Sequence, residues 1–282
     1  MKIRDLIRSA SRELAKNDVP ESYAKLMANE LLIQVNRNLY LEMDSEVDDI
    51  FIKQFNAKID RLKTQEPFAY VLGTQYFYGR DFNVDARVLI PRPETEELVA
   101  NMLADIDERY ADKTDLVLAD IGTGSGCLAV SLKLEEPKLS VYALDISSEA
   151  IDLAKVNAEK LGADIEFIIG DMLEPLKDRN IKVDILVCNP PYIPQNELLE
   201  TSVKGFEPHV ALFGGEDGLL FYKRVFEDAA ALVNEGGMLG FEIGWNQAEF
   251  LRNLAQESLP LDEVVIRQDI SGKDRMLMIY RK

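Results

Sequence analysis

Cysteine and histidine are scarce in this chain of 282 residues, which holds two cysteines and one histidine. Two thiols, Cys127 and Cys188, cannot build a disulfide framework, and their scarcity is typical of a protein from the reducing cytoplasm. We interpret both as small packed side chains. The single histidine, His209, lies in a predicted loop, where a structural role is favoured over a catalytic one.

Basic residues are also under-represented, because 32 Lys and Arg face 50 Asp and Glu for a formal net charge of −18. Residues 1–80 hold 12 of each sign, so the whole acidic excess falls on residues 81–282. Acidic surfaces repel the phosphate backbone of nucleic acids, and direct nucleic-acid binding is therefore disfavoured. The neutral first segment is compatible with docking of a protein substrate.

Long apolar runs are missing as well. None approaches the roughly 18 residues that a membrane span requires. The first 14 residues mix charged and apolar side chains, which does not resemble a signal peptide. We therefore expect a soluble cytoplasmic protein with no membrane partner.

The length predicts two domains. Residues 1–74 carry three apolar stripes at helical spacing, which predict a small all-α helical bundle for substrate docking. Residues 75–92 are interpreted as a hairpin linker with a turn at Gly79, and residues 93–282 as the larger domain. The stripes are Ile3, Leu6, Ile7, Ala10 and Leu14; Ala24, Met27, Ala28, Leu31, Leu32 and Val35; and Ile52, Phe55, Ile59 and Leu62.

After residue 113, short apolar runs alternate with amphipathic stretches, a pattern typical of a parallel sheet covered by helices on both faces. The loop between the last two runs is too short for a parallel crossover, so these strands should form an antiparallel hairpin. We predict an α/β fold: a doubly wound, mostly parallel, seven-stranded Rossmann-like sheet preceded by the helical bundle. The predicted strands are 116–121, 139–146, 165–170, 183–188, 238–243, 263–268 and 276–280.

A glycine-rich loop follows the first strand of this sheet and precedes a helix. Its glycines allow the backbone to approach a ligand whose anionic end meets the helix N–H groups. The spacing departs from the G-x-G-x-x-G of dinucleotide sites, and a tight strand-to-helix turn without a ligand is the alternative. The loop consists of Gly122, Thr123, Gly124, Ser125 and Gly126.

Acidic residues end the next two strands. Asp145 stands 19 residues after Gly126, where a carboxylate can bind a ribose diol. Asp171 and Met172 follow the third strand and offer a carboxylate and a soft apolar side chain to an adenine ring. Open α/β sheets bind ligands at these strand ends. A ribose–adenine ligand without a pyrophosphate favours S-adenosylmethionine over NAD.

The fourth strand ends in Asn189, Pro190, Pro191 and Tyr192. The prolines make a stiff turn that offers carbonyl acceptors and no N–H donors. Asn189 Oδ1 and the Pro190 carbonyl can accept both hydrogens of a planar NH2 group, on which Tyr192 can stack. Such bonds raise the electron density of the nitrogen and align it with a methyl–sulfonium bond, so no metal is needed. The alternative is a rigid turn without function.

The glycine loop and the Asn-Pro-Pro-Tyr tetrapeptide together resemble class I methyltransferases that act on amide or amine nitrogens. Further segments resemble one family of that class, the peptide chain release factor glutamine methyltransferases. With the helical domain included, the resemblance covers nearly the whole chain. These segments are 66–70 with Gly73, 89–96, 206–208 with Ala211 and Leu212, and 214–219.

This resemblance implies methylation of the glutamine side-chain amide in the Gly-Gly-Gln loop of release factors, with S-adenosylhomocysteine as the second product. An aromatic residue is often expected where Met172 stands. The implied acceptor-holding residues are Asn189, Pro190, Pro191 and Tyr192. The implied cofactor-binding residues are Gly122, Thr123, Gly124, Ser125, Gly126, Asp145, Asp171, Met172 and Asn189.

Three other functions stay open. An adenine-N6 or other nucleic-acid amine methyltransferase can use the same tetrapeptide, but it would need a basic cleft. A dehydrogenase is disfavoured by the glycine spacing and by the lack of an obvious hydride-site acid or base. A noncatalytic cofactor-binding scaffold is disfavoured by the intact tetrapeptide.

Overall fold

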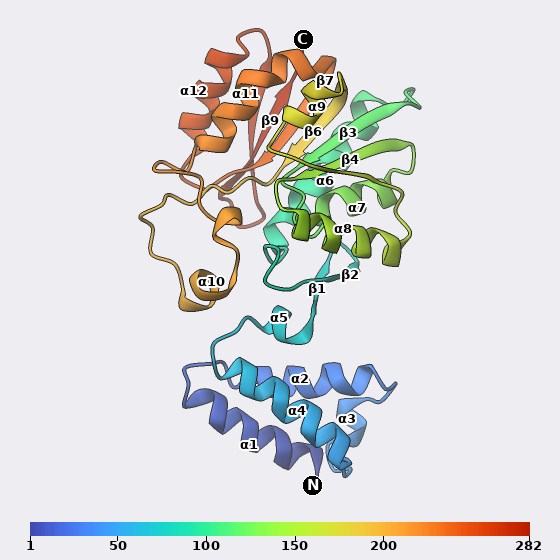
Figure 1. Ribbon diagram of the computed structural model, residues 1–282, viewed down its shortest axis with the longest axis vertical. Coiled ribbons are helices and arrows are strands. Elements are labelled where there is room, and N and C mark those ends of the chain that lie inside the picture. The colour runs from blue at the N-terminus through green and yellow to red at the C-terminus, as the bar shows by residue number, and fades with distance from the viewer. The chain divides into compact units, whose positions relative to one another are not determined.

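The computed structural model of the chain describes all 282 residues, which divide into two compact units (Figure 1). The first unit comprises Met1–Thr74 with Leu199–Phe206, and the second comprises Gln75–Leu198 with Glu207–Lys282. The first unit has one apolar core, and the second has a core on each face of its sheet.

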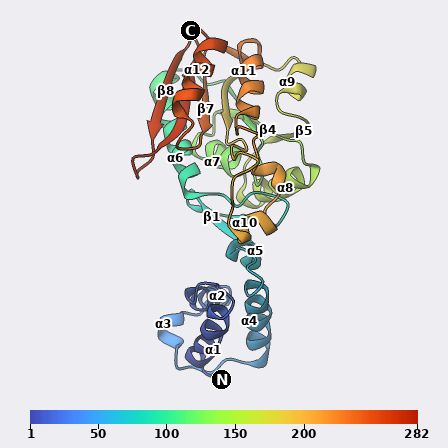
Figure 2. The same ribbon diagram turned by 90° about the vertical axis from the view of Figure 1, so that its left-hand side faces the viewer.

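The first unit is helical, and its helices α1, α2 and α4 pack against one another (Figure 2). Asp48 accepts a hydrogen bond from the N–H of Phe51 at 2.8 Å and so caps the start of α4. The predicted stripes are buried or partly buried except for Val35, which is exposed because α2 ends before it. The helices are α1 (Ile3–Ala15), α2 (Ser22–Ile33), α3 (Leu39–Glu42), α4 (Asp49–Leu62), α5 (Phe68–Leu72) and α10 (Thr201–Phe206).

The second unit is built on a seven-stranded sheet in the order β5-β4-β3-β6-β7-β9-β8. Strands β3 to β7 are parallel, whereas β9 runs antiparallel to both β7 and β8. The predicted α/β class and terminal hairpin are therefore confirmed. The strands are β3 (Leu116–Ile121), β4 (Leu139–Asp145), β5 (Glu166–Ile169), β6 (Val183–Cys188), β7 (Val233–Glu242), β8 (Glu263–Gln268) and β9 (Asp274–Tyr280).

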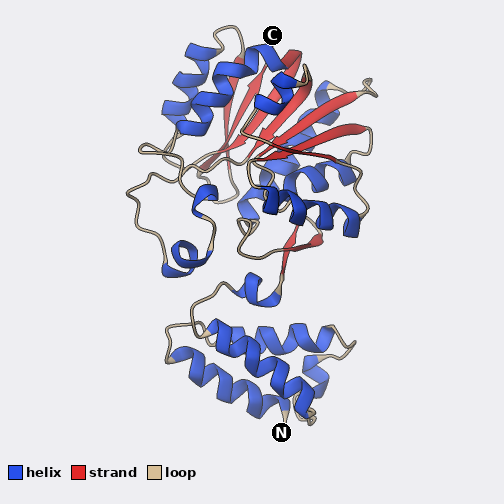
Figure 3. Ribbon diagram, viewed as in Figure 1, coloured by secondary structure: helices blue, strands red, loops and turns tan.

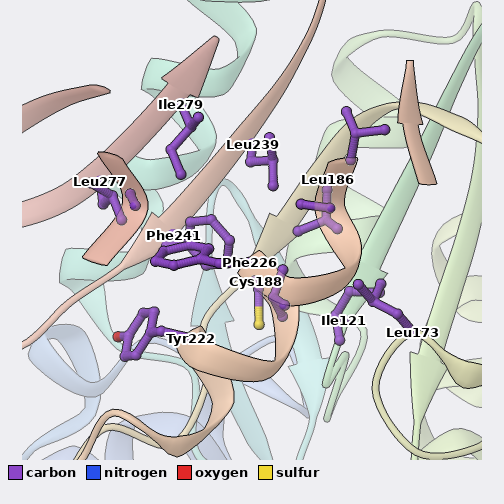
Figure 4. Packing of buried hydrophobic residues seen from close by; sticks show 14 of the residues in the cluster. Ile121, Leu173, Leu186, Cys188, Tyr222, Phe226, Leu239, Phe241, Leu277 and Ile279 are labelled. Carbon is purple, nitrogen blue, oxygen red and sulfur yellow. The ribbon is translucent and has the colours of Figure 1, made fainter. Parts of the chain in front are cut away.

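Helices cover both faces of this sheet (Figure 3). Helices α6 (Pro93–Arg109), α7 (Cys127–Glu135) and α8 (Ser148–Leu161) contribute to the apolar core on one face. Helices α9 (Glu174–Asp178), α11 (Leu220–Leu232) and α12 (Ala248–Ser258) contribute to the core on the other. In that second core the rings of Phe226 and Phe241 meet edge to face, with centroids 5.5 Å apart (Figure 4).

A short hairpin precedes the sheet, with strands β1 (Thr74–Phe77) and β2 (Arg80–Asn83). Both turn residues, Tyr78 and Gly79, have positive φ, as a type I′ turn requires. Phe77 and Phe82 are fully buried against the α6 side of the sheet. The hairpin is thus anchored by two aromatic side chains.

Strand β7 is longer than predicted. It begins at Val233 rather than at Met238, although Gly236 and Gly237 suggest a turn. A register irregularity between β6 and β7 absorbs these glycines, so pairing with β6 already starts at Val233.

Candidate functional site

A cavity of about 300 Å³ opens where the carboxyl ends of β3, β4, β5 and β6 meet. This is the point at which the strand order reverses, because β3 lies between β4 and β6. The cavity is mostly apolar with few polar groups, as small-molecule sites are. Of the sequence-predicted residues, it brings together Gly122, Gly124, Asp145, Asp171, Met172, Asn189, Pro190 and Pro191.

The glycine loop presents only part of itself to the cavity. Gly122, Gly124 and Gly126 all have positive φ, so the loop depends on glycine to fold. Gly122 and Gly124 line the cavity. Thr123, Ser125 and Gly126 are buried behind it, and a Cβ on Gly126 would lie 3.2 Å from Cβ of Ala154 in α8. These three residues shape the loop and do not line the cavity.

Asp145 closes one side of the loop. Its carboxylate accepts hydrogen bonds from the N–H groups of Gly124 and Ser147, each at 2.9 Å. Burial raises the pKa of Asp145, while these backbone donors oppose that rise. Each carboxylate oxygen retains lone-pair capacity toward the cavity.

Asp171 does not stand free at the cavity edge. Arg224 of α11 donates to both of its carboxylate oxygens, at 3.0 and 2.7 Å, and also lines the cavity. This ion pair orients the carboxylate and leaves its remaining lone pairs available to a ligand. Met172 lines the cavity in a left-handed backbone conformation, φ 49°.

The turn after β6 carries a buried polar network. Asn189 Nδ2 donates to Thr95 Oγ1 at 3.1 Å and to Glu242 Oε2 at 3.0 Å. Thr95 donates to the same Glu242 oxygen at 2.6 Å, and the hydroxyl of Tyr192 donates to Oε1 at 3.2 Å. Asn189 Oδ1 takes no part in these bonds. Asn189, Pro190 and Pro191 line the cavity, whereas Tyr192 does not.

Glu242 is the centre of this network. It ends β7, is 2% exposed, and its pKa is raised by burial, against which Thr95, Arg275 and Tyr192 act. Sequence reasoning missed it, although a signal was present: a glutamate inside a continuous apolar run predicts a buried charge with a task. Thr95, at the start of α6, lies in the family-like segment 89–96, but nothing in its own sequence context singled it out.

The glycine-containing loop of residues 214–219 packs closely against the backbone of the Asn-Pro-Pro-Tyr tetrapeptide. A Cβ on Gly218 would lie 2.3 Å from the carbonyl oxygen of Tyr192, and one on Gly214 would lie 2.4 Å from that of Pro191. Gln247 also donates to the Tyr192 carbonyl, at 3.0 Å. This backing explains physically why residues 214–219 need glycine.

Gly218→Ala is expected to lower the free energy of unfolding by about 2–4 kcal/mol, since it adds a backbone clash to an unfavourable positive φ. Gly236→Ala is the matched control: its φ is similar, +72° against +75°, but a Cβ there would meet nothing within 4 Å. Urea unfolding of both variants checks the prediction, and equal losses would contradict it.

Asp120, the acid that precedes the glycine loop, is fully buried. It accepts hydrogen bonds from Thr123 Oγ1 at 2.6 Å and from the N–H of Ala129 at 3.2 Å, which ties the loop to the start of α7. Burial raises the pKa of Asp120 to about 7.

This raised pKa makes stability depend on pH. The folded protein keeps the proton on Asp120 up to about pH 7, whereas the unfolded chain loses it near 3.8. The folded state therefore binds more protons in this window, and its stability should fall as pH rises, by up to about 1.4 kcal/mol per pH unit. Asp120→Asn should lack this slope. Urea unfolding of both proteins between pH 5 and 8 measures it; a wild-type-minus-variant difference that ignores pH would contradict the assignment.

Two segments that are far apart in the sequence together line one side of the cavity. Glu207, 3% exposed, accepts a hydrogen bond from the N–H of Ile90 at 3.1 Å and pairs with Arg92 at 2.6 Å. Val88 and Leu89 on one side, and residues 208, 210 and 211 on the other, line the cavity. The predicted segments 89–96 and 206–208 thus meet through one buried glutamate.

Other predicted features have simpler outcomes. His209 starts the 3₁₀ helix η1 (His209–Ala211), stacks edge-on against Phe213 and does not line the cavity. Cys127 and Cys188 are free thiols whose pKa values are raised by burial. The structure contains no group of three or more His, Cys, Asp or Glu side chains arranged to hold a metal ion. No helix is both long and apolar enough to cross a membrane.

Solved structures show the same fold at low sequence identity. A methyltransferase from Pyrococcus furiosus superposes with a TM-score of 0.54 at 16% identity, over 80% of this chain and 97% of that one. The methyltransferase domain of METTL16 superposes with a TM-score of 0.53 at 20% identity, over 72% and 89%. The second unit is thus a Rossmann-like methyltransferase fold.

Sequence comparisons identify the family. The methyltransferase small domain matches residues 98–206, and the PrmC N-terminal domain matches residues 5–73. The release factor glutamine methyltransferase of Bacillus cereus is 40% identical over 280 residues, 98% of each chain. That of Bacillus subtilis is 38% identical over 98% of this chain and 96% of its own length. This chain therefore belongs to the release factor glutamine methyltransferase family.

Proposed function

We propose that this protein transfers a methyl group from S-adenosylmethionine to the side-chain amide nitrogen of the glutamine in the Gly-Gly-Gln loop of a peptide chain release factor. The observation that carries the proposal is the hydrogen bonding of the Asn189 side chain. Its Nδ2 is occupied by Thr95 and Glu242, so its Oδ1 is left for an N–H donor at the cavity. The family membership supports the same substrate.

The residues that line the cavity match the chemical groups of the cofactor. Gly122 and Gly124 bring backbone close to a ligand, and Asp145 offers carboxylate lone pairs to a ribose diol. Asp171 and Met172 border the same cavity and would hold the adenine. When bound, S-adenosylmethionine supplies a methyl group activated by a sulfonium leaving group.

Residues of the turn after β6 would bind and orient the amide that accepts the methyl group. Asn189 Oδ1 and the Pro190 carbonyl would each accept one amide hydrogen, which orients the nitrogen and raises its electron density. Transfer would form the N–C bond and leave S-adenosylhomocysteine, and the methylated amide would then release one of these hydrogens as a proton, which restores its neutral charge. Positioning accounts for most of the rate gain, because the methyl group already carries a good leaving group.

Tyr192 does not line the cavity, so it would shape the slot through its hydrogen bond to Glu242 rather than by stacking on the acceptor. Burial raises its pKa, so the hydroxyl stays protonated and can remain a donor to Glu242. Pro191 lines the cavity beside it. The neutral charge of residues 1–80 supports a docking role for the helical unit toward the protein substrate.

Incubation with methyl-labelled cofactor tests the substrate class. Parallel reactions would contain either a release factor or nucleic acid, followed by location of the label. We expect the label on the glutamine side chain of the release factor. Label on a nucleic-acid amine would instead establish the alternative acceptor, which the net charge of −18 disfavours.

A further inference from the structure

We propose that Glu242 is a positioning residue for the methyl acceptor: with the Thr95 hydroxyl, its carboxylate fixes the Asn189 amide so that Oδ1 faces the acceptor. This inference rests on the proposed function, because it concerns how the amide-accepting turn is oriented. Glu242 does not line the cavity, so it acts through Asn189 and Tyr192.

The directions of the hydrogen bonds determine how the Asn189 amide is oriented. Thr95 has one hydroxyl hydrogen and donates it to Glu242 at 2.6 Å. Toward Asn189, the Thr95 oxygen can therefore act only as an acceptor, and both carboxylate oxygens of Glu242 already accept hydrogen bonds, from Thr95 and Tyr192. Asn189 thus faces two acceptors, at 3.1 and 3.0 Å, and must place its NH2 group there.

Burial makes this orientation costly to reverse. Thr95 and Glu242 are each 2% exposed, so water is not available as a substitute partner. Turning the amide by 180° would aim Asn189 Oδ1 at two oxygens that have no hydrogen to offer. The network therefore selects one of two amide orientations of nearly equal shape.

The selected orientation has a consequence for specificity. With Oδ1 at the cavity, the site accepts an N–H donor, such as a carboxamide, and opposes a carboxylate of the same size. Glutamine and glutamate differ in this respect, so the buried Glu242 would help the enzyme reject an acid at the acceptor position.

Glu242→Gln tests the inference because it keeps the shape and exchanges one oxygen for a donor. The carboxamide of this variant can bond Thr95 Oγ1 and a reversed Asn189 Oδ1 while still accepting from Tyr192. Thr95 can redirect its hydroxyl to the helix backbone, as helical threonines do. We expect kcat to fall about 10²-fold, while the Kd for S-adenosylmethionine changes less than threefold.

Discrimination is the readout that a merely structural role would not change. Binding of a release factor with its native glutamine is compared with binding of the same protein carrying glutamate at that position. Wild type should prefer glutamine, and Glu242→Gln should reduce that preference at least tenfold. Methyl transfer by the wild type, measured alongside, separates a failure of this inference from a failure of the proposed function.

Tyr222→Phe is the matched control. The Tyr222 hydroxyl donates to the backbone carbonyl of Glu242 at 2.6 Å and is fully buried, so its loss disturbs the same residue without touching the carboxylate. This variant should melt at a lower temperature but keep kcat and discrimination within threefold of wild type. The inference is overturned if Glu242→Gln retains wild-type kcat, or if it loses activity with its discrimination unchanged.

A second variant covers the case in which Glu242→Gln does not fold. Thr95→Val removes one of the two acceptors that face Asn189, and it should lower kcat and weaken the discrimination. Thr95→Ser restores the hydroxyl and should recover most of both. Equal behaviour of the valine and serine variants would overturn the inference.

Discussion

Asn189→Ala is expected to lower the rate of methyl transfer to a release factor by about 10²–10³-fold. The variant loses the Oδ1 acceptor, so the amide nitrogen is neither oriented nor enriched in electron density. The fold should persist, because the turn keeps the hydrogen bond from Gln247 to the Tyr192 carbonyl, and Glu242 keeps those from Thr95 and Tyr192. The measurement is transfer of labelled methyl, with the Kd for S-adenosylmethionine determined calorimetrically and expected within threefold of wild type.

His209→Ala serves as the comparison for this experiment. The His209 ring meets the Phe213 ring edge to face and lies outside the cavity lining, so its removal should leave a folded and active enzyme. Wild-type turnover by Asn189→Ala would refute the assigned role. Loss of the chemical step in His209→Ala, with cofactor binding preserved, would refute the structural role given to the histidine.

Asp145→Ala is expected to raise the Kd for S-adenosylmethionine about 10- to 100-fold. A charged acceptor for a ribose diol contributes about 1.5–3 kcal/mol. The same change also frees the N–H groups of Gly124 and Ser147, which should loosen the glycine loop. Calorimetric titration with S-adenosylmethionine measures the effect, and a parallel titration with NAD should show no binding to either protein.

Asp164→Ala separates local contact from overall charge. Asp164 is exposed, lies in the loop after α8, and does not line the cavity. The Asp164→Ala variant loses the same charge as Asp145→Ala, so its Kd for the cofactor should match that of wild type. If Asp145→Ala bound the cofactor as tightly as Asp164→Ala, the diol assignment would fail.

Most of the sheet could be predicted because buried parallel strands consist of apolar runs. The parallel strands β3 and β6 begin and end where the runs predicted, and so does β8, an antiparallel edge strand that is only partly buried. Strand β7 did not, since Gly236 and Gly237 resemble a turn and only pairing with β6 shows that they continue a strand. Local composition indicates which segments form strands. It does not indicate a bulge, because a bulge depends on pairing with the neighbouring strand.

The cavity shows the same limit. Short-range motifs predicted that Gly122, Gly124, Asp145 and Asn189 lie together, and all four line one cavity, because parallel strands end at a common edge. Arg224 and Thr95 could not be found this way, since they reach the site from α11 and α6 through tertiary packing alone. Glu242 was accessible in principle, as an acid in an apolar run.

The reversal of strand order between β3 and β6 separates the residues assigned to the methyl donor from those assigned to the methyl acceptor. The residues assigned only to the donor of the methyl group follow β3, β4 and β5, whereas the Asn-Pro-Pro-Tyr turn follows β6 and Glu242 ends β7. Substitutions on the second side can therefore redirect the enzyme to a new recipient while the first side is inherited unchanged. An ancestor with this arrangement could have given rise to enzymes for chemically unrelated recipients by altering two strand ends and the loops behind them.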